Sequence, residues 1–194
     1  MPSDDRFARA LELIDAANSA DPKGQELPYS QRMTAWLERL SPAAADYLRL
    51  AARAQHLRRW EIPRASFPMD RIGYLKWRTT LYQFHADNAA EILSAVGYDD
   101  ATIARVASLL KKQNFKTDPD AQLLEDVICL VFLQYEFTGF LAQHAADEPK
   151  VLNILQRTWK KMSPQGHAAA LTLLPSLPQP AQNIITKALA RTDG

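Results

Sequence analysis

The spacing of apolar residues constrains the fold most strongly, because it is helical along nearly the whole chain. Phe7, Leu11 and Ile14 repeat at intervals of three and four residues, which is the period of one face of an α-helix, and the same period recurs toward the C-terminus. No run alternates apolar and polar residues as a half-buried strand would. The sequence therefore predicts an all-α fold, a multi-helix bundle.

Capping residues and prolines divide this pattern into separate helices. Ser41-Pro42 combines a capping serine with a proline suited to the first helical position, which predicts a helix from residue 41 to about Trp60. Asp70 and Gly97 bracket a long helix, the glycine serving as its C-cap. We further expect helices over residues 3–18, 30–40, 99–113, 121–144 and 181–190, helix starts at Glu148 and Ser163, and loops over 21–28 and 61–70.

A chain of 194 residues is long enough to bury one sizeable core. We therefore predict a single domain over residues 1–194, with a helical core at about 41–145 and the terminal helices 3–18 and 148–190 packed on it. The hydrophobic fraction of 47% is that of an ordinary globular protein and argues against extensive disorder.

Composition excludes several classes of protein. A single cysteine, Cys129, rules out an intramolecular disulfide and a Cys-rich zinc site. A net charge of +1 argues against a generally basic nucleic-acid-binding protein. The first residues are acidic where a signal peptide would be basic, and no apolar run reaches the length of a membrane span. These features predict a cytoplasmic protein without a membrane partner.

Two adjacent carboxylates, Glu125 and Asp126, interrupt the most apolar segment, Leu123–Leu133. This segment is apolar on every helical face, so it should be central to the core. A buried carboxylate needs a cation, a metal or several hydrogen-bond donors. Asp126 could therefore be a structural partner of a basic side chain or a helix cap, or else a metal ligand or general base.

Two histidines, His56 and His85, lie on other predicted helices with apolar and aromatic neighbours. A lone histidine on such a face is usually a structural residue. Two histidines and Asp126, coming from three helices, form a recognised ligand set for zinc, iron or manganese. The sequence separations leave open whether the three side chains meet.

Residues 53–78 are basic and aromatic. They carry seven basic residues against two acidic ones, so their local charge is +5 and the remainder of the chain carries −4. Guanidinium groups bind phosphate in fork geometry, and aromatic faces stack on bases or on arginine. The alternative is a solvated surface whose arginine stems pack on tryptophan. The candidate ligand-binding residues are Arg53, Arg59, Trp60, Arg64, Trp77 and Arg78.

Several segments together resemble a domain-of-unknown-function family of bacteria and fungi, some of whose members are labelled glutamyl-tRNA synthetase without any synthetase motif. The resemblance covers nearly the whole chain and implies a family without implying an activity. The segments are Gln55–Arg64, Gly73–Arg78, Phe84–Ala86, Gln122–Val127 and Thr158–Ser163.

The chain is more distantly similar to the HD superfamily of metal-dependent phosphohydrolases, which are all-α. His85 matches the first histidine of that superfamily, Asp126 matches the aspartate of its last core helix, and Lys111-Lys112 stand where its His-Asp doublet would be. The resemblance implies one divalent metal (zinc, iron or manganese) on His56, His85 and Asp126, with His56 replacing the lost ligand. Alternatively, the lysines occupy the cation's space and pair with Asp126.

Three functions follow from these resemblances and patterns. The first is a metal-dependent phosphohydrolase acting on a phosphorylated small molecule or nucleotide, with Glu125, Asp126 and Lys112 as candidate catalytic residues. The second is a non-catalytic helical module that binds a phosphorylated ligand or RNA through residues 53–78. The third is a structural partner in a larger complex, which predicts an exposed apolar patch on the terminal helices. The oligomeric state is left open.

Overall fold

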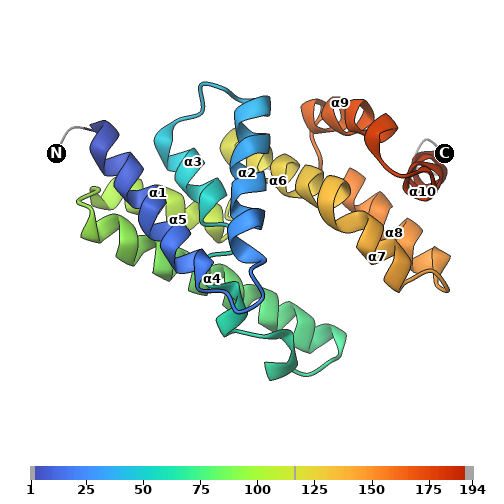
Figure 1. Ribbon diagram of the computed structural model, residues 1–194, viewed down its shortest axis with the longest axis horizontal. Coiled ribbons are helices and arrows are strands. Elements are labelled where there is room, and N and C mark those ends of the chain that lie inside the picture. Colours follow the sequence, from blue (N-terminus) through green and yellow to red (C-terminus); the bar gives the residue numbers. More distant parts are fainter. Residues whose placement is uncertain (1–2, 116, 191–194) are drawn as a thin grey trace. The chain divides into compact units, whose positions relative to one another are not determined.

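A computed structural model describes residues 3–115 and 117–190, and it confirms the all-α fold: those two ranges contain helices and no strand (Figure 1). The α-helices are α1 Ser3–Ser19, α2 Glu26–Leu40, α3 Asp46–Arg53, α4 Arg71–Ala95, α5 Asp100–Leu110, α6 Pro119–Val131, α7 Phe137–Gln143, α8 Glu148–Trp159, α9 Pro164–Leu173 and α10 Gln179–Leu189. Shorter helical turns are η1 Arg59–Glu61, η2 Arg64–Ser66, η3 Phe132–Glu136 and η4 Leu174–Ser176.

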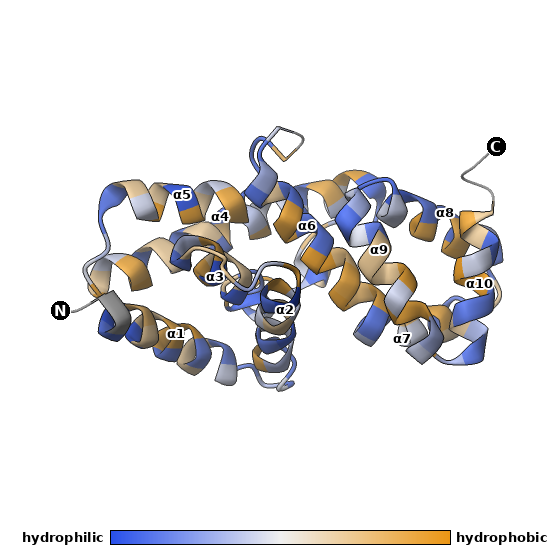
Figure 2. Cartoon of the chain, turned by 90° about the horizontal axis from the view of Figure 1, so that it is seen from above, coloured by the Kyte–Doolittle hydropathy of each residue, from blue (hydrophilic) through white to orange (hydrophobic). Residues whose placement is uncertain are grey.

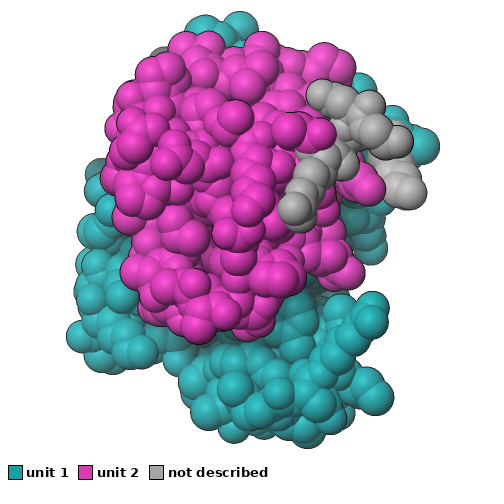
Figure 3. Space-filling model, turned by 90° about the vertical axis from the view of Figure 1, so that its right-hand side faces the viewer, with its two compact units in different colours: residues 1–121 teal, residues 122–194 magenta. Residues whose placement is uncertain are grey.

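The chain gathers into two compact units, residues 1–121 and 122–194, which Figure 3 shows in different colours. The boundary falls in the first turn of α6. Each unit contains fully buried apolar side chains, such as Met33 and Leu81 in the first and Leu130 and Phe137 in the second. The single domain with a core over residues 41–145 stays a prediction.

The longest described helix of the first unit is α4, with 25 residues. Its N-cap Asp70 accepts a hydrogen bond from the Gly73 N–H, and Gly97 follows its C-terminus with φ +84°, as the sequence predicts. It contacts α5 and α1, while α3 contacts both α2 and α5. Figure 2 shows hydrophobic and hydrophilic residues interspersed along these helices. In α4 buried side chains such as Trp77 and Leu81 are spaced four residues apart, so they share one face of the helix.

The helix predicted from residue 41 to Trp60 is wrong at both ends. Ser41 ends α2, its N–H donating to the Leu37 carbonyl, and α3 then covers only Asp46–Arg53. Arg58 has φ +55°, in the left-handed region, so the helix cannot continue through it. The residues after α3 form turns instead.

The second helix starts earlier than predicted. The residues expected as a loop over 21–28 include the first turn of α2, which begins at Glu26. The Asp21 carboxylate accepts hydrogen bonds from the N–H groups of Lys23, Gln25 and Glu26. These bonds satisfy the donors at the start of the helix, as an N-cap side chain would. Burial alone would raise the pKa of Asp21, but the three N–H groups lower it.

In the second unit the predicted helix over 121–144 is interrupted. The π-helical turn η3 separates α6 from α7, which ends at Gln143. The predicted starts at Glu148 and Ser163 are confirmed, since Asp147 caps α8 and Ser163 caps α9, each just before a proline-containing first turn.

Within the described ranges, no helix combines the length and the apolarity needed to cross a membrane.

Candidate functional site

The turns after α3 are held by polar side chains from α1 and α4. The Arg58 N–H donates to Oδ1 of the buried Asn18 at 3.2 Å, and the Arg58 guanidinium donates to Oδ1 of Asn88 at 2.8 Å. Nδ1 of His85 donates to the Leu57 carbonyl at 2.8 Å. These bonds stabilise the left-handed conformation of Arg58, and they fix the position of the two residues that flank it.

One of the residues so placed is Arg59, which is linked through His56 to Glu26. The Arg59 guanidinium lies 3.2 Å from Nε2 of His56, and Nδ1 of His56 lies 3.3 Å from a Glu26 carboxylate oxygen. Arginine can only donate, so Nε2 is the acceptor and the imidazole proton lies on Nδ1, facing Glu26. The Tyr29 ring stacks on the imidazole at a centroid distance of 3.8 Å.

A tryptophan supports the other side of the same guanidinium. Arg59 lies over the Trp77 ring, 4.8 Å from its centroid, and the Trp77 indole N–H donates to the Ile62 carbonyl at 2.8 Å. The guanidinium is thus held by a hydrogen bond and by a cation–π contact. Its orientation is fixed before any ligand arrives.

Arg59 lines a pocket of about 360 Å³. Four of the six predicted ligand-binding residues are brought together here, while Arg53 and Arg78 do not line it. The lining residues are Asp21, Pro22, Lys23, Gln25, Glu26, Arg59, Trp60, Ile62, Pro63, Arg64 and Trp77.

The charged groups of the pocket differ in how they are already bonded. The Arg64 guanidinium donates to the carbonyls of Phe67, Pro68 and Asp70, and so fixes the loop before α4. Asp21 accepts its three backbone N–H groups, and Glu26 faces His56. Arg59 is therefore the cation best placed to take up an anion, with Lys23 and Arg64 adding positive potential.

The two histidines predicted as metal ligands lie close together, with ring centroids 6.0 Å apart. Burial, and then the nearby charge of Arg59, lower the pKa of His56 well below its ordinary value. Burial lowers the pKa of His85 to about 4. Nε2 of His85 is buried, and no hydrogen-bond partner for it occurs among the described residues. Both rings are therefore neutral near pH 7.

The remaining predicted residues of the first unit have other partners. Arg53 forms a bidentate ion pair with Asp15, with N–O distances of 2.6 Å, and donates to Thr34. Arg78 hydrogen-bonds to the Tyr82 hydroxyl. The Lys112 ammonium lies 5.6 Å from the centroid of the Tyr82 ring, and Lys112 has φ +55°.

Glu125 and Asp126 belong to the second unit. Asp126 accepts hydrogen bonds from the Ser163 N–H at 2.8 Å, from the Ser163 hydroxyl and from the Gln122 amide at 3.2 Å. It thereby holds the residue that caps α9. Glu125 pairs with Lys161 at 3.4 Å. These bonds fit the structural alternative for Asp126, a partner of a helix cap, while its catalytic and metal-binding roles stay predictions.

Two cations and a carboxylate lie near the two histidines. Of the residues described, no three His, Cys, Asp or Glu side chains form a group that could hold a metal ion. The positive charges of Arg59 and Lys112 act on His56, while the Glu26 carboxylate lies 3.3 Å from its Nδ1. The metal site on His56, His85 and Asp126 stays a prediction.

Sequence reasoning missed Asn18, Lys23, Glu26 and Tyr29. Lys23 and Glu26 fell in a predicted loop, and Asn18 and Tyr29 carried no motif. For Asn18 the available signal was an asparagine near the end of the helix predicted over residues 3–18, because a polar residue at a helix end often bonds a neighbouring backbone.

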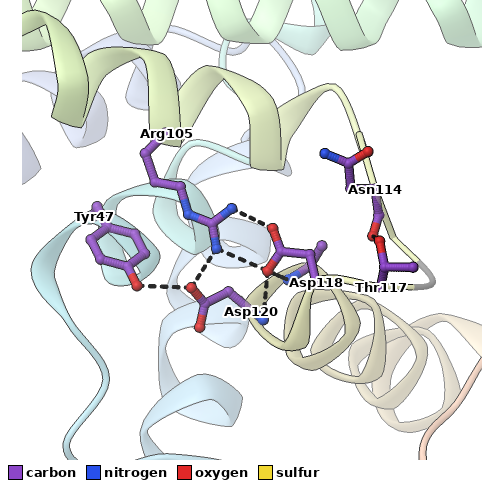
Figure 4. Close-up of polar contacts among 7 residues, drawn as sticks. Tyr47, Arg105, Asn114, Thr117, Asp118 and Asp120 are labelled. Carbon is purple, nitrogen blue, oxygen red and sulfur yellow. Dashed lines mark hydrogen bonds and ion pairs between the residues drawn. The ribbon is translucent and has the colours of Figure 1, made fainter.

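A second polar cluster, also missed, fixes the start of α6 (Figure 4). The Arg105 guanidinium reaches the carboxylates of Asp118 and Asp120, and the Tyr47 hydroxyl donates to Asp120 at 2.8 Å. The hydrogen bond from Arg105 lowers the pKa of Asp118 to about 2. Every charge in this cluster has a partner, so its role is structural.

The large apolar side chains that are exposed gather mainly at the start of α4. Met69 and Ile72 are 77% and 78% exposed, and Tyr74 and Leu75 follow them. The third functional interpretation placed such a patch on the terminal helices, where Leu171 is the one large apolar side chain found exposed among the described residues.

The family described as a domain of unknown function, DUF4202, matches residues 8–185. No curated protein and no solved structure matches the chain.

Proposed function

Because the chain belongs to the DUF4202 family, whose description names no activity, we propose its function from the site itself: the first unit binds a phosphorylated small molecule in the pocket around Arg59. In this proposal the unit is a binding module and need not turn its ligand over.

The fixed guanidinium of Arg59 carries the proposal. Only His56, of the described residues, accepts a hydrogen bond from it, so most of its five N–H donors are left for a ligand. The planar fork of these donors matches phosphate oxygens and forms short, charge-assisted bonds. Since His56 and Trp77 already orient the group, binding costs little side-chain entropy.

The size of the pocket supports a small molecule over RNA. A volume of about 360 Å³ lies within the range of small-molecule sites, roughly 300–1,000 Å³. Binding to an RNA strand uses an open groove that follows the backbone, with cations spaced along it. Here the cations Lys23, Arg59 and Arg64 line one pocket, together with two carboxylates that already have hydrogen-bond or ion-pair partners.

The phosphohydrolase function stays a prediction. Nε2 of His85 is buried and has no hydrogen-bond partner among the described residues, but His85 does not line the pocket, and burial lowers its pKa to about 4, so its imidazole is a weak base near pH 7.

Calorimetric titration with ribose 5-phosphate tests the binding proposal. Arg59→Gln should weaken binding at least tenfold, because hydrogen bonds to charged groups contribute about 1.5–3 kcal/mol. Arg71→Gln is the matched control, since it removes the same charge from an exposed residue outside the pocket. Equal losses in the two variants, or undetectable binding to the wild type, would refute the proposal.

A further inference from the structure

We propose that the ligand also contains a planar aromatic ring, which stacks on Trp60, so that the pocket takes a phosphorylated nucleoside. This inference rests on the proposed phosphate site and names the class of its ligand.

Trp60 carries the inference, because its side chain lines the pocket and its indole has no hydrogen bond or ring contact among the described residues. The ring is half-buried. Within the described parts of the chain it has no aromatic or cationic stacking partner, and its N–H has no acceptor. A large aromatic side chain at the wall of a polar pocket offers a flat face to which a nucleobase can stack.

The other three tryptophans have defined structural contacts, which sets Trp60 apart. Trp77 supports Arg59 and hydrogen-bonds Ile62. Trp159 stacks on His167 with a centroid distance of 3.8 Å and an interplanar angle of 8°. Trp36 is buried in α2 beneath the Arg39 guanidinium.

The position of Trp60 in the chain places a ring site next to the phosphate site. Arg59 and Trp60 are consecutive residues of the short turn η1, and both line the pocket. Ile62 and Pro63 add apolar wall, and the Gln25 amide adds a group that can both donate and accept. A ligand with a phosphate at one end and a polar-edged ring at the other fits these features.

Three probes separate the contributions of the ring and the phosphate. AMP carries both, ribose 5-phosphate carries the phosphate alone, and adenosine carries the ring alone. In the wild type, AMP should bind more tightly than either fragment. Base–aromatic stacking contributes enough for roughly a 5- to 150-fold difference between AMP and ribose 5-phosphate. This comparison needs no variant, so it cannot be confused with a folding defect.

Variants of Trp60 then assign the effect to this residue. Trp60→Leu should lower the AMP affinity by a larger factor than the ribose 5-phosphate affinity, whereas Trp60→Phe should keep most of the AMP affinity. Equal affinities of AMP and ribose 5-phosphate in the wild type, or a Trp60→Leu variant that binds AMP normally, would overturn the inference while the phosphate site stands. If neither phosphate binds, the proposed function itself fails.

Discussion

The Arg59 guanidinium donates a hydrogen bond to Nε2 of His56, at 3.2 Å, while the opposite nitrogen of the same ring faces Glu26. His56 is therefore a positioning residue in our account: it orients the cation that binds the ligand and does not touch the ligand itself.

Replacing His56 tests this positioning role. His56→Phe keeps the stacking on Tyr29 but removes the acceptor, so we expect binding of ribose 5-phosphate to weaken about tenfold, the value of one hydrogen bond to a charged group. His56→Gln supplies a carbonyl acceptor and should recover most of the affinity. If both variants lose thermal stability but retain wild-type affinity, His56 has only a structural role.

Arg53 was predicted to bind the ligand, but we expect it to contribute to the stability of the fold and not to ligand binding. Arg53→Lys removes the bidentate pair with Asp15, which joins α3 to α1, and we expect the free energy of unfolding to fall by about 1–2 kcal/mol. Arg9→Lys is the control, because the Arg9–Glu12 pair is exposed and contributes little. Urea unfolding measures both, and a weakened affinity for ribose 5-phosphate in Arg53→Lys would place this residue in the site after all.

Two glycine substitutions should have opposite effects. A Cβ at Gly166 would lie 2.6 Å from an Asp126 oxygen, so Gly166→Ala should destabilise the fold by about 1–3 kcal/mol despite alanine's higher helix propensity. Gly139 is also helical, with nothing within 4 Å of its Cβ position, and Gly139→Ala should stabilise by up to about 1 kcal/mol. Thermal unfolding of the two variants measures both effects. A Gly166→Ala variant more stable than the wild type would show that Asp126 does not approach α9 this closely.

The pKa of His85 predicts a loss of stability in mild acid. It falls from 6.5 to about 4 on folding, so the unfolded chain binds the proton more readily. This contribution is fully present above pH 6.5 and is lost as the pH falls toward 4, by about 3 kcal/mol in total.

The His85→Asn variant isolates this effect. Its amide can still donate to the Leu57 carbonyl, but it does not titrate, so the unfolding free energy should vary less between pH 6.5 and 4 than in the wild type. The contribution of Asp118, whose pKa is lowered to about 2, is lost only below pH 3.8 and so falls outside this window. An unchanged pH profile in His85→Asn would show that the ring is solvated.

Local signals predicted most of the helices, because their determinants are close together in sequence. Asp70 and Gly97 bracket α4 as expected, and Ser163-Pro164 begins α9. The helix predicted to reach Trp60 ends at Arg53 instead. The turns that follow it are held by bonds from Asn18, His85 and Asn88, which are distant in sequence and so give no local signal.

The candidate site was predicted only in part, because composition identifies residue types but not the partners that the fold gives them. The basic and aromatic composition of residues 53–78 identified Arg59, Trp60, Arg64 and Trp77, all of which line the pocket. Composition does not show which arginine is already bonded, so Arg53 could not be separated from Arg59. Glu26 lacked any local signal, because its role depends on where the turns after α3 place His56.

In our account a phosphorylated ligand binds beside Arg59, and the indole N–H signals of the four tryptophans report on this binding. Trp60 and Trp77 line the pocket, whereas Trp36 and Trp159 do not. In a ¹H–¹⁵N correlation spectrum, with signals assigned by tryptophan-to-phenylalanine variants, titration with AMP should shift the Trp60 and Trp77 signals in a saturable way and leave the other two unchanged. If the Trp60 and Trp77 signals stay fixed at millimolar AMP, or if the Trp36 and Trp159 signals move instead, the claim is contradicted.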